Sequence, residues 1–113
     1  MGIQTILAQV ACSDLTAAEA WYTKLFGKPA LRHPMAGLAE WQFTGSAEVQ
    51  LFEDKVNAGH SVLTLGVLPM RREVERLREE GLEVGEVEEA SSFYIMRMRD
   101  LDGNLIVLAS AEK

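Results

Sequence analysis

The chain has 113 residues, of which 48% are hydrophobic and 25% are charged, and these proportions are typical of one globular domain. Its formal net charge is −6, which argues against nucleic acid and anionic membranes as partners because both require a basic surface. No apolar run is long enough to cross a bilayer, the first residues lack the pattern of a signal peptide, and the single cysteine, Cys12, excludes an internal disulfide. We therefore expect one domain over residues 1–113, in the cytoplasm.

The first part of the chain has the pattern of a strand followed by a helix. Side chains alternate in character over residues 6–12, which predicts a strand with Leu7, Gln9 and Ala11 on one face. Thr16 and Glu19 have the spacing of a capping box and predict the start of a helix. Apolar residues at helical spacing then continue up to Gly27, where the helix should end: Ala18, Trp21, Tyr22, Leu25 and Phe26.

The same order of elements is predicted twice. Strands are expected over residues 30–33, 38–43 and 48–52, before a polar linker at 54–59. A second alternating strand over residues 60–68 leads into a helix from Pro69 to Gly81, and three further strands follow over 83–87, 93–98 and 105–110. This repetition indicates an internal duplication, with halves at about residues 3–54 and 60–111.

Three motifs within this order resemble the vicinal oxygen chelate superfamily of glyoxalase I, bleomycin-resistance proteins and extradiol dioxygenases. They are Asp14-Leu15 followed by Trp21-Tyr22 and Phe26-Gly27, the turn Asp100-Leu101-Asp102-Gly103-Asn104, and Glu80-Gly81-Leu82-Glu83-Val84. The resemblance implies an α+β fold of two βαβββ modules that form a curled mixed sheet around a cleft, with the helices outside. It also implies a homodimer.

In metal-dependent members of this superfamily, four side chains in the cleft hold a divalent ion. Carried over to this sequence, the four positions are Leu7, Gln50, His60 and Val107. Leucine and valine have no lone pairs to donate, and one histidine with one neutral amide is too small a set for a catalytic metal. We therefore expect no metal and no other cofactor.

The alternation of the strands predicts the lining of the cleft. It is largely apolar with a few polar groups, as small-molecule sites are. The predicted ligand-binding residues are Leu7, Gln9, Glu48, Gln50, Phe52, His60, Val62, Arg97 and Val107. His60 is the one candidate for proton transfer, because histidine titrates near neutral pH, while Arg97 would hold an anionic group or lie in solvent. Cys12 should be buried and inert.

Three functions remain open. The leading hypothesis is metal-free binding of a small, partly apolar molecule, as in drug or metabolite sequestration. The first alternative is a lyase, isomerase or dioxygenase of the glyoxalase type that uses His60, with or without a divalent metal. The second is a non-catalytic interaction subunit. Whether the chain is an enzyme is not decided by the sequence.

Overall fold

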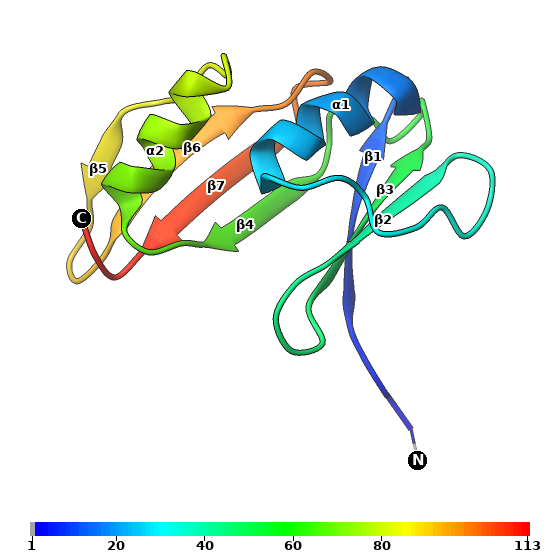
Figure 1. The fold of residues 1–113 in the computed structure, drawn as a ribbon, viewed down its shortest axis with the longest axis horizontal. Helices are drawn as coiled ribbons and strands as arrows, with labels where there is room; N and C mark the ends of the chain where they lie inside the picture. Colours follow the sequence, from blue (N-terminus) through cyan, green and yellow to red (C-terminus); the bar gives the residue numbers. More distant parts are fainter. Residues whose placement is uncertain (1) are drawn as a thin grey trace.

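The computed structural model describes residues 2–113 and contains two helices and seven strands (Figure 1). In the first half of the chain these are β1 (Leu7–Cys12), α1 (Leu15–Phe26), β2 (Leu38–Gln42) and β3 (Glu48–Glu53). In the second half they are β4 (Val62–Gly66), α2 (Met70–Glu79), β5 (Val87–Glu89), β6 (Tyr94–Arg99) and β7 (Leu105–Ser110). The predicted α+β class is confirmed, with a strand and a helix followed by further strands in each half. Neither helix in residues 2–113 is long and apolar enough to span a membrane.

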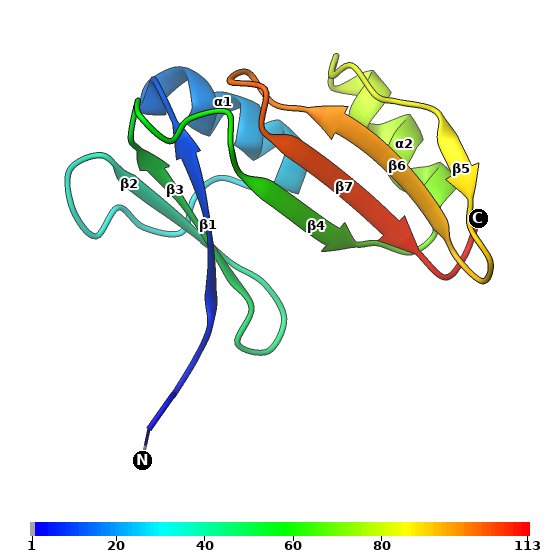
Figure 2. The ribbon, with the colours of Figure 1, turned by 180° about the vertical axis from the view of Figure 1, so that it is seen from behind.

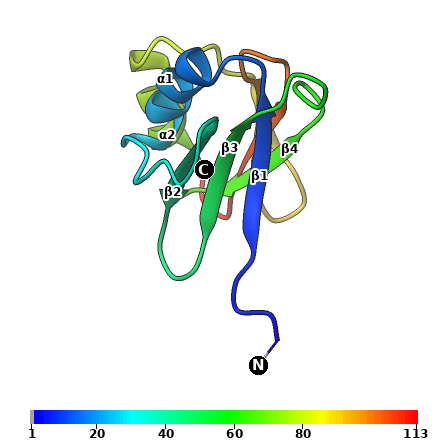
Figure 3. The ribbon, with the colours of Figure 1, turned by 90° about the vertical axis from the view of Figure 1, so that its right-hand side faces the viewer.

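The strands form two separate mixed sheets with the orders β1-β3-β2 and β4-β7-β6-β5. In each sheet the strand that precedes the helix pairs in parallel with the last strand of that half. Both helices lie on the same side of the sheets. Figure 2 shows the sheet faces that the helices leave uncovered, and Figure 3 shows the molecule from the side, with the helices on one side of the strands. β1 and β4 are each the edge strand of their sheet, and they approach each other at one end only.

Several predicted boundaries are wrong, each for a local reason. The cap of α1 is Asp14, whose Oδ1 accepts a hydrogen bond from the backbone N–H of Ala17 at 3.3 Å, so the capping box at Thr16 does not form. Glu19, its predicted partner, binds His33 instead. The helix does end at Gly27, which takes the left-handed conformation with φ 73°.

Three predicted strands are shorter or displaced. Residues 30–33 form only an isolated bridge between Arg32 and Glu40, because Pro29 and Pro34 on either side restrict pairing. β5 starts at Val87 and not at residue 83. Before it, the backbone of Gly85 passes so close to β6 that a Cβ there would lie 2.1 Å from the carbonyl oxygen of Arg97. β4 begins at Val62, which leaves His60 in the turn that precedes it.

The core lies between the helices and the inner faces of both sheets. The predicted stripes supply it: Ala18, Tyr22 and Leu25 of α1, and Met70, Val74 and Leu77 of α2, are buried. Trp41 is fully buried and donates its indole N–H to the carbonyl of Lys28 at 2.9 Å. Cys12 is also fully buried, as predicted, and burial is the main reason that the pKa of its thiol rises to about 12.

A buried polar network at the Asp100–Asn104 turn joins the two halves. Asp100 is 8% exposed, and its carboxylate accepts hydrogen bonds from the Tyr22 hydroxyl at 2.5 Å and from the Asn104 backbone and side chain, each at 2.8 Å. Burial, followed by the hydrogen bond to Asp100, raises the pKa of Tyr22 far above its usual range, so the phenol keeps its proton. Asn104, fully buried, also donates to the carbonyl of Ala11 at 2.9 Å and accepts the N–H of Ser61 at 2.8 Å.

We expect Asn104→Ala to lower the free energy of unfolding by about 3 kcal/mol, because it leaves a carbonyl, an N–H and part of a carboxylate without their buried partners. Urea denaturation measures this change. Asn57→Ala is the matched control: the amide of Asn57 binds Asp54 in an exposed turn, so its loss should cost less than about 0.5 kcal/mol. Equal losses for the two variants would contradict a structural role for the network.

Candidate functional site

The pairing of the strands places most of the predicted site residues on the sheet faces opposite the helices. In the N-terminal sheet Leu7 pairs with Glu48, Gln9 with Gln50, and Ala11 with Phe52. In the C-terminal sheet Val62 pairs with Leu105, Thr64 with Val107, and Arg97 with Val107. Paired residues share a face, so the predicted residues form one group on each sheet. We call this surface the open face.

His60 lies outside both groups. It is exposed, in the turn before β4, and its backbone N–H donates to the carbonyl of Asn57 at 3.2 Å. The register offers a second candidate for the ligand position that was carried over to His60. Leu7 lies two residues before Gln9, the partner of Gln50, and the residue in the same relation to Val107 is Val62.

The residues at the ligand positions therefore do not fit a metal. With Val62 in place of His60 the set is three aliphatic side chains and one amide, and none of these holds a divalent ion without help from histidine or carboxylate. Within residues 2–113, no three histidine, cysteine, aspartate or glutamate side chains gather where they would hold an ion.

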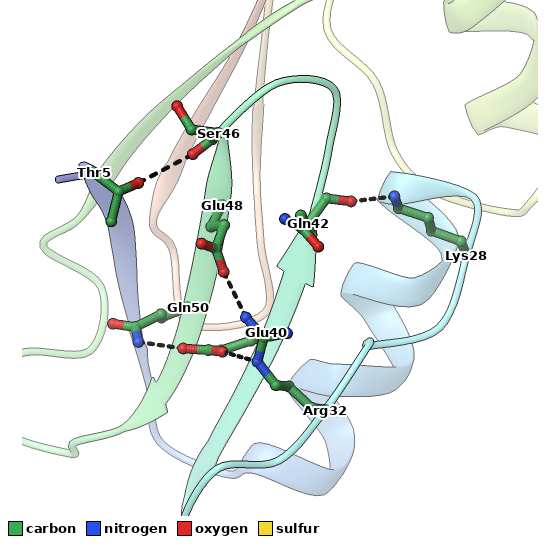
Figure 4. Close-up of polar contacts among 8 residues, drawn as sticks. All are labelled: Thr5, Lys28, Arg32, Glu40, Gln42, Ser46, Glu48 and Gln50. Atoms are coloured by element: carbon green, nitrogen blue, oxygen red, sulfur yellow. Dashed lines mark hydrogen bonds and ion pairs between the residues drawn. The ribbon is translucent and has the colours of Figure 1, made fainter.

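A connected set of polar side chains covers the N-terminal part of the open face, and Figure 4 shows four of them: Arg32, Glu40, Glu48 and Gln50. Arg32 donates from Nε to Glu40 Oε1 at 2.7 Å and from Nη2 to Glu48 Oε1 at 2.9 Å. Gln50 donates to the other oxygen of Glu40 at 2.5 Å, and Gln9 donates to the amide oxygen of Gln50 at 3.2 Å. We call these five residues, Gln9, Arg32, Glu40, Glu48 and Gln50, the Glu40 cluster.

The electrostatics of the Glu40 cluster keep its central carboxylate ionised. Glu40 is buried, which by itself would raise its pKa, but the hydrogen bond from Gln50 and then the contact with Arg32 hold the pKa below its usual range. Two members are exposed to solvent: Arg32, with a side chain that is 49% exposed, and Gln9. The cluster can thus offer guanidinium and amide N–H groups and carboxylate oxygens to a molecule on the open face, but it contains no group poised to give up a proton.

The pattern of the strands predicts three members of this cluster, Gln9, Glu48 and Gln50, but the predicted site residues do not include Glu40 or Arg32. Glu40 alternates with the apolar residues Trp41 and Phe43 along its strand, and this alternation is the signal that could have placed it opposite the core. No pattern identified Arg32, because it reaches the cluster from a segment that makes only one bridge.

The C-terminal part of the open face is mainly apolar. Val62 is 67% exposed, with Leu105 and Val107 beside it. Arg97 points from the same face and forms an exposed ion pair with Glu88 at 2.5 Å, so its charge is already matched.

A large cavity lies elsewhere, on the helix side, between the two sheets. Its volume is about 1130 Å³, and its walls include Ala8, Phe26, Lys28, Phe43, Leu63 and Leu65. Of the nine predicted ligand-binding residues only Glu48 borders it. We call it the inter-sheet cavity.

Solved structures with this fold include proteins of different function. A glyoxalase/bleomycin resistance protein from Catenulispora acidiphila matches with a TM-score of 0.87 and 28% sequence identity, over 96% of this chain and 98% of that chain. TnmS3, an antibiotic binding protein from Streptomyces, matches with a TM-score of 0.78 and 22% identity, over 97% of this chain and 98% of that one. A lactoylglutathione lyase from Agrobacterium tumefaciens matches with a TM-score of 0.78 and 16% identity, over 97% of this chain and 94% of that chain. No family model matches the sequence, and no curated protein matches it.

The chain therefore has the fold of the glyoxalase and bleomycin-resistance proteins, and its predicted resemblance to the vicinal oxygen chelate superfamily is confirmed. Because one fold supports both an antibiotic-binding protein and a lyase, function has to be argued from the residues of the site.

The ionised state of Glu40 gives a pH prediction. A carboxyl group whose pKa is lowered by folding stabilises the protein above its unfolded pKa, near 4.5, and this stabilisation is lost as the pH falls through the folded value. We expect wild type to be more stable than Glu40→Gln at pH 7, and the difference to shrink below about pH 4.5. Urea denaturation between pH 3 and 8 measures it. The control is Glu83→Gln at an exposed position, whose free energy of unfolding should stay close to that of wild type at every pH. A stability difference between wild type and Glu40→Gln that does not change with pH would contradict the lowered pKa of Glu40.

Proposed function

We propose that the protein binds a small, partly apolar molecule on the open face and does not transform it. The observation that carries this proposal is the Glu40 cluster, in which polar groups converge on a surface that also presents the apolar side chains of Leu7 and Phe52. Ligand sites combine an apolar surface with a few fixed polar groups that set orientation. Sequestration of a drug or metabolite is the role that this surface favours, and an antibiotic-binding protein with the same fold supports it.

Binding is favoured over catalysis because the described groups lack an activated acid or base. Glu40 is held as a carboxylate by two donors, and His60 is exposed in a turn, without a side-chain partner among residues 2–113. The enzyme alternative, a lyase, isomerase or dioxygenase that uses His60, is supported only by the fold that it shares with a lactoylglutathione lyase. No feature of the described residues specifically favours the third hypothesis, a non-catalytic interaction subunit.

The proposal includes a homodimer in the cytoplasm. The open face exposes Val62 and Leu7 at the edges of the two sheets, and a second copy that covers them would both bury apolar surface and enclose the Glu40 cluster.

Light scattering tests the dimer. At micromolar concentration we expect about twice the mass of 12.5 kDa, and Val62→Lys, which puts a charge on the most exposed apolar residue of the face, should shift the population towards monomer. A monomer mass for wild type over the same concentrations would remove the dimer from the proposal.

Calorimetric titration with a panel of drug-sized aromatic compounds tests binding on the open face. For any compound that binds, we expect Gln50→Ala to weaken the affinity about tenfold, the effect of losing one or two buried hydrogen bonds. The matched control, Gln4→Ala in the exposed N-terminal segment, should have no effect. The affinity and the melting temperature of wild type should not change when Zn²⁺, Ni²⁺ or Mn²⁺ is added after chelation.

Two results would contradict the proposal. Uptake of metal at about one ion per chain, with a higher melting temperature, would show that the metal-free assignment is wrong. Turnover of a bound compound that is lost in His60→Ala would establish the enzyme alternative.

A further inference from the structure

The inter-sheet cavity exists because two sheet edges diverge. β1 pairs only with β3, and β4 only with β7, within residues 2–113. The two edges meet where the backbone N–H of Ala11 donates to the hydroxyl of Ser61 at 3.2 Å. Away from this point a wedge remains between Ala8 on one edge and Leu63 and Leu65 on the other, closed on the helix side by the end of α1.

The size and walls of the cavity suit a small molecule. Protein interiors are packed closely and rarely leave voids much larger than a water molecule, whereas drug-sized ligands occupy roughly 300–1,000 Å³. The volume here is about 1130 Å³. One wall is aromatic, with the rings of Phe26 and Phe43 in edge contact at 5.1 Å between centroids.

The charges that border the cavity leave one cation unmatched. Glu73 is paired with Arg76 at 2.5 Å, and Glu48 is paired with Arg32 at 2.9 Å. The Lys28 ammonium donates to the carbonyl of Gln42 and lies 4.5 Å from the centroid of the Phe43 ring. No carboxylate in the described part of the chain pairs with it. An anionic group would therefore meet a free positive charge beside an aromatic wall.

We propose that the inter-sheet cavity is a second binding site, separate from the open face, for an anionic aromatic molecule whose carboxylate or sulfonate meets Lys28 and whose rings pack between Phe26, Phe43 and Leu65. This site is independent of the proposed function, because only Glu48 is shared between its walls and the Glu40 cluster.

A pair of fluorescent probes tests the proposal. 1-Anilinonaphthalene-8-sulfonate has the sulfonate, and N-phenyl-1-naphthylamine is the same molecule without it. We expect saturable binding of the sulfonate at about one per chain. Lys28→Met, which keeps the apolar stem, should weaken the sulfonate about tenfold and leave the neutral probe unchanged. Added salt should weaken the sulfonate only.

Two further substitutions locate the site. Ala8→Phe and Ala47→Trp place bulk at two different points of the cavity wall and should reduce binding of both probes, provided that each variant keeps a cooperative melting transition. Gln50→Ala, in the Glu40 cluster, is the control and should leave both affinities unchanged.

Any of three results would overturn the proposal. The first is an equal effect of Lys28→Met on the two probes. The second is full binding by a folded cavity-filling variant. The third is weaker binding in Gln50→Ala, which would place the probes on the open face. If neither filling variant folds, the Lys28→Met comparison and the salt series still decide the matter.

Discussion

Asp100 sits in the turn before the last strand, and its buried carboxylate connects parts of the chain that are far apart in sequence. It binds the Tyr22 hydroxyl of α1 and both nitrogens of Asn104, while Asn104 binds the backbone of Ala11 at the end of β1 and of Ser61 before β4. A buried carboxylate is stable only when its hydrogen bonds are satisfied. This one site therefore fixes where the two halves of the molecule touch.

The rest of the architecture follows from that fixed point. Because the two sheets are held together at the ends of β1 and β4 and do not pair further along, their edges diverge and leave the inter-sheet cavity. Arg76 of α2 adds a second link on the helix side, where it donates to the carbonyls of Lys24 and Leu25 at the end of α1. The turn thus has a structural role, and this role does not require a catalytic carboxylate on the apolar strand that follows it.

The open face and the inter-sheet cavity share Glu48 and Thr64 at their border and differ in chemistry. The Glu40 cluster offers carboxylates balanced by one arginine, whereas the cavity offers an apolar interior and an unmatched lysine. The open face results from the alternation of the strands, because a strand that buries alternate side chains must present the others on its far side. The aromatic residues Trp41 and Phe43 are on the core side of β2 and its extension, and Glu40 is therefore on the open face.

The sequence alone determined the elements whose signals are local. Alternating or apolar runs identified β1, β3, β6 and β7 closely, the apolar stripes identified the buried sides of both helices, and the motifs identified the fold family. Where two neighbouring residues could both cap a helix, the sequence pattern predicted the wrong one: the cap of α1 is Asp14 and not Thr16.

Only the tertiary structure decided which residues meet. The register of parallel strands depends on pairing across long stretches of chain, so the sequence could not show that Val62 has the position in β4 that Leu7 has in β1. Arg32 joined Glu40 through a segment without strand character, and the cavity arose from the angle between two sheets. None of these features has a period or a spacing in the sequence, because each depends on contacts between residues that only folding brings together.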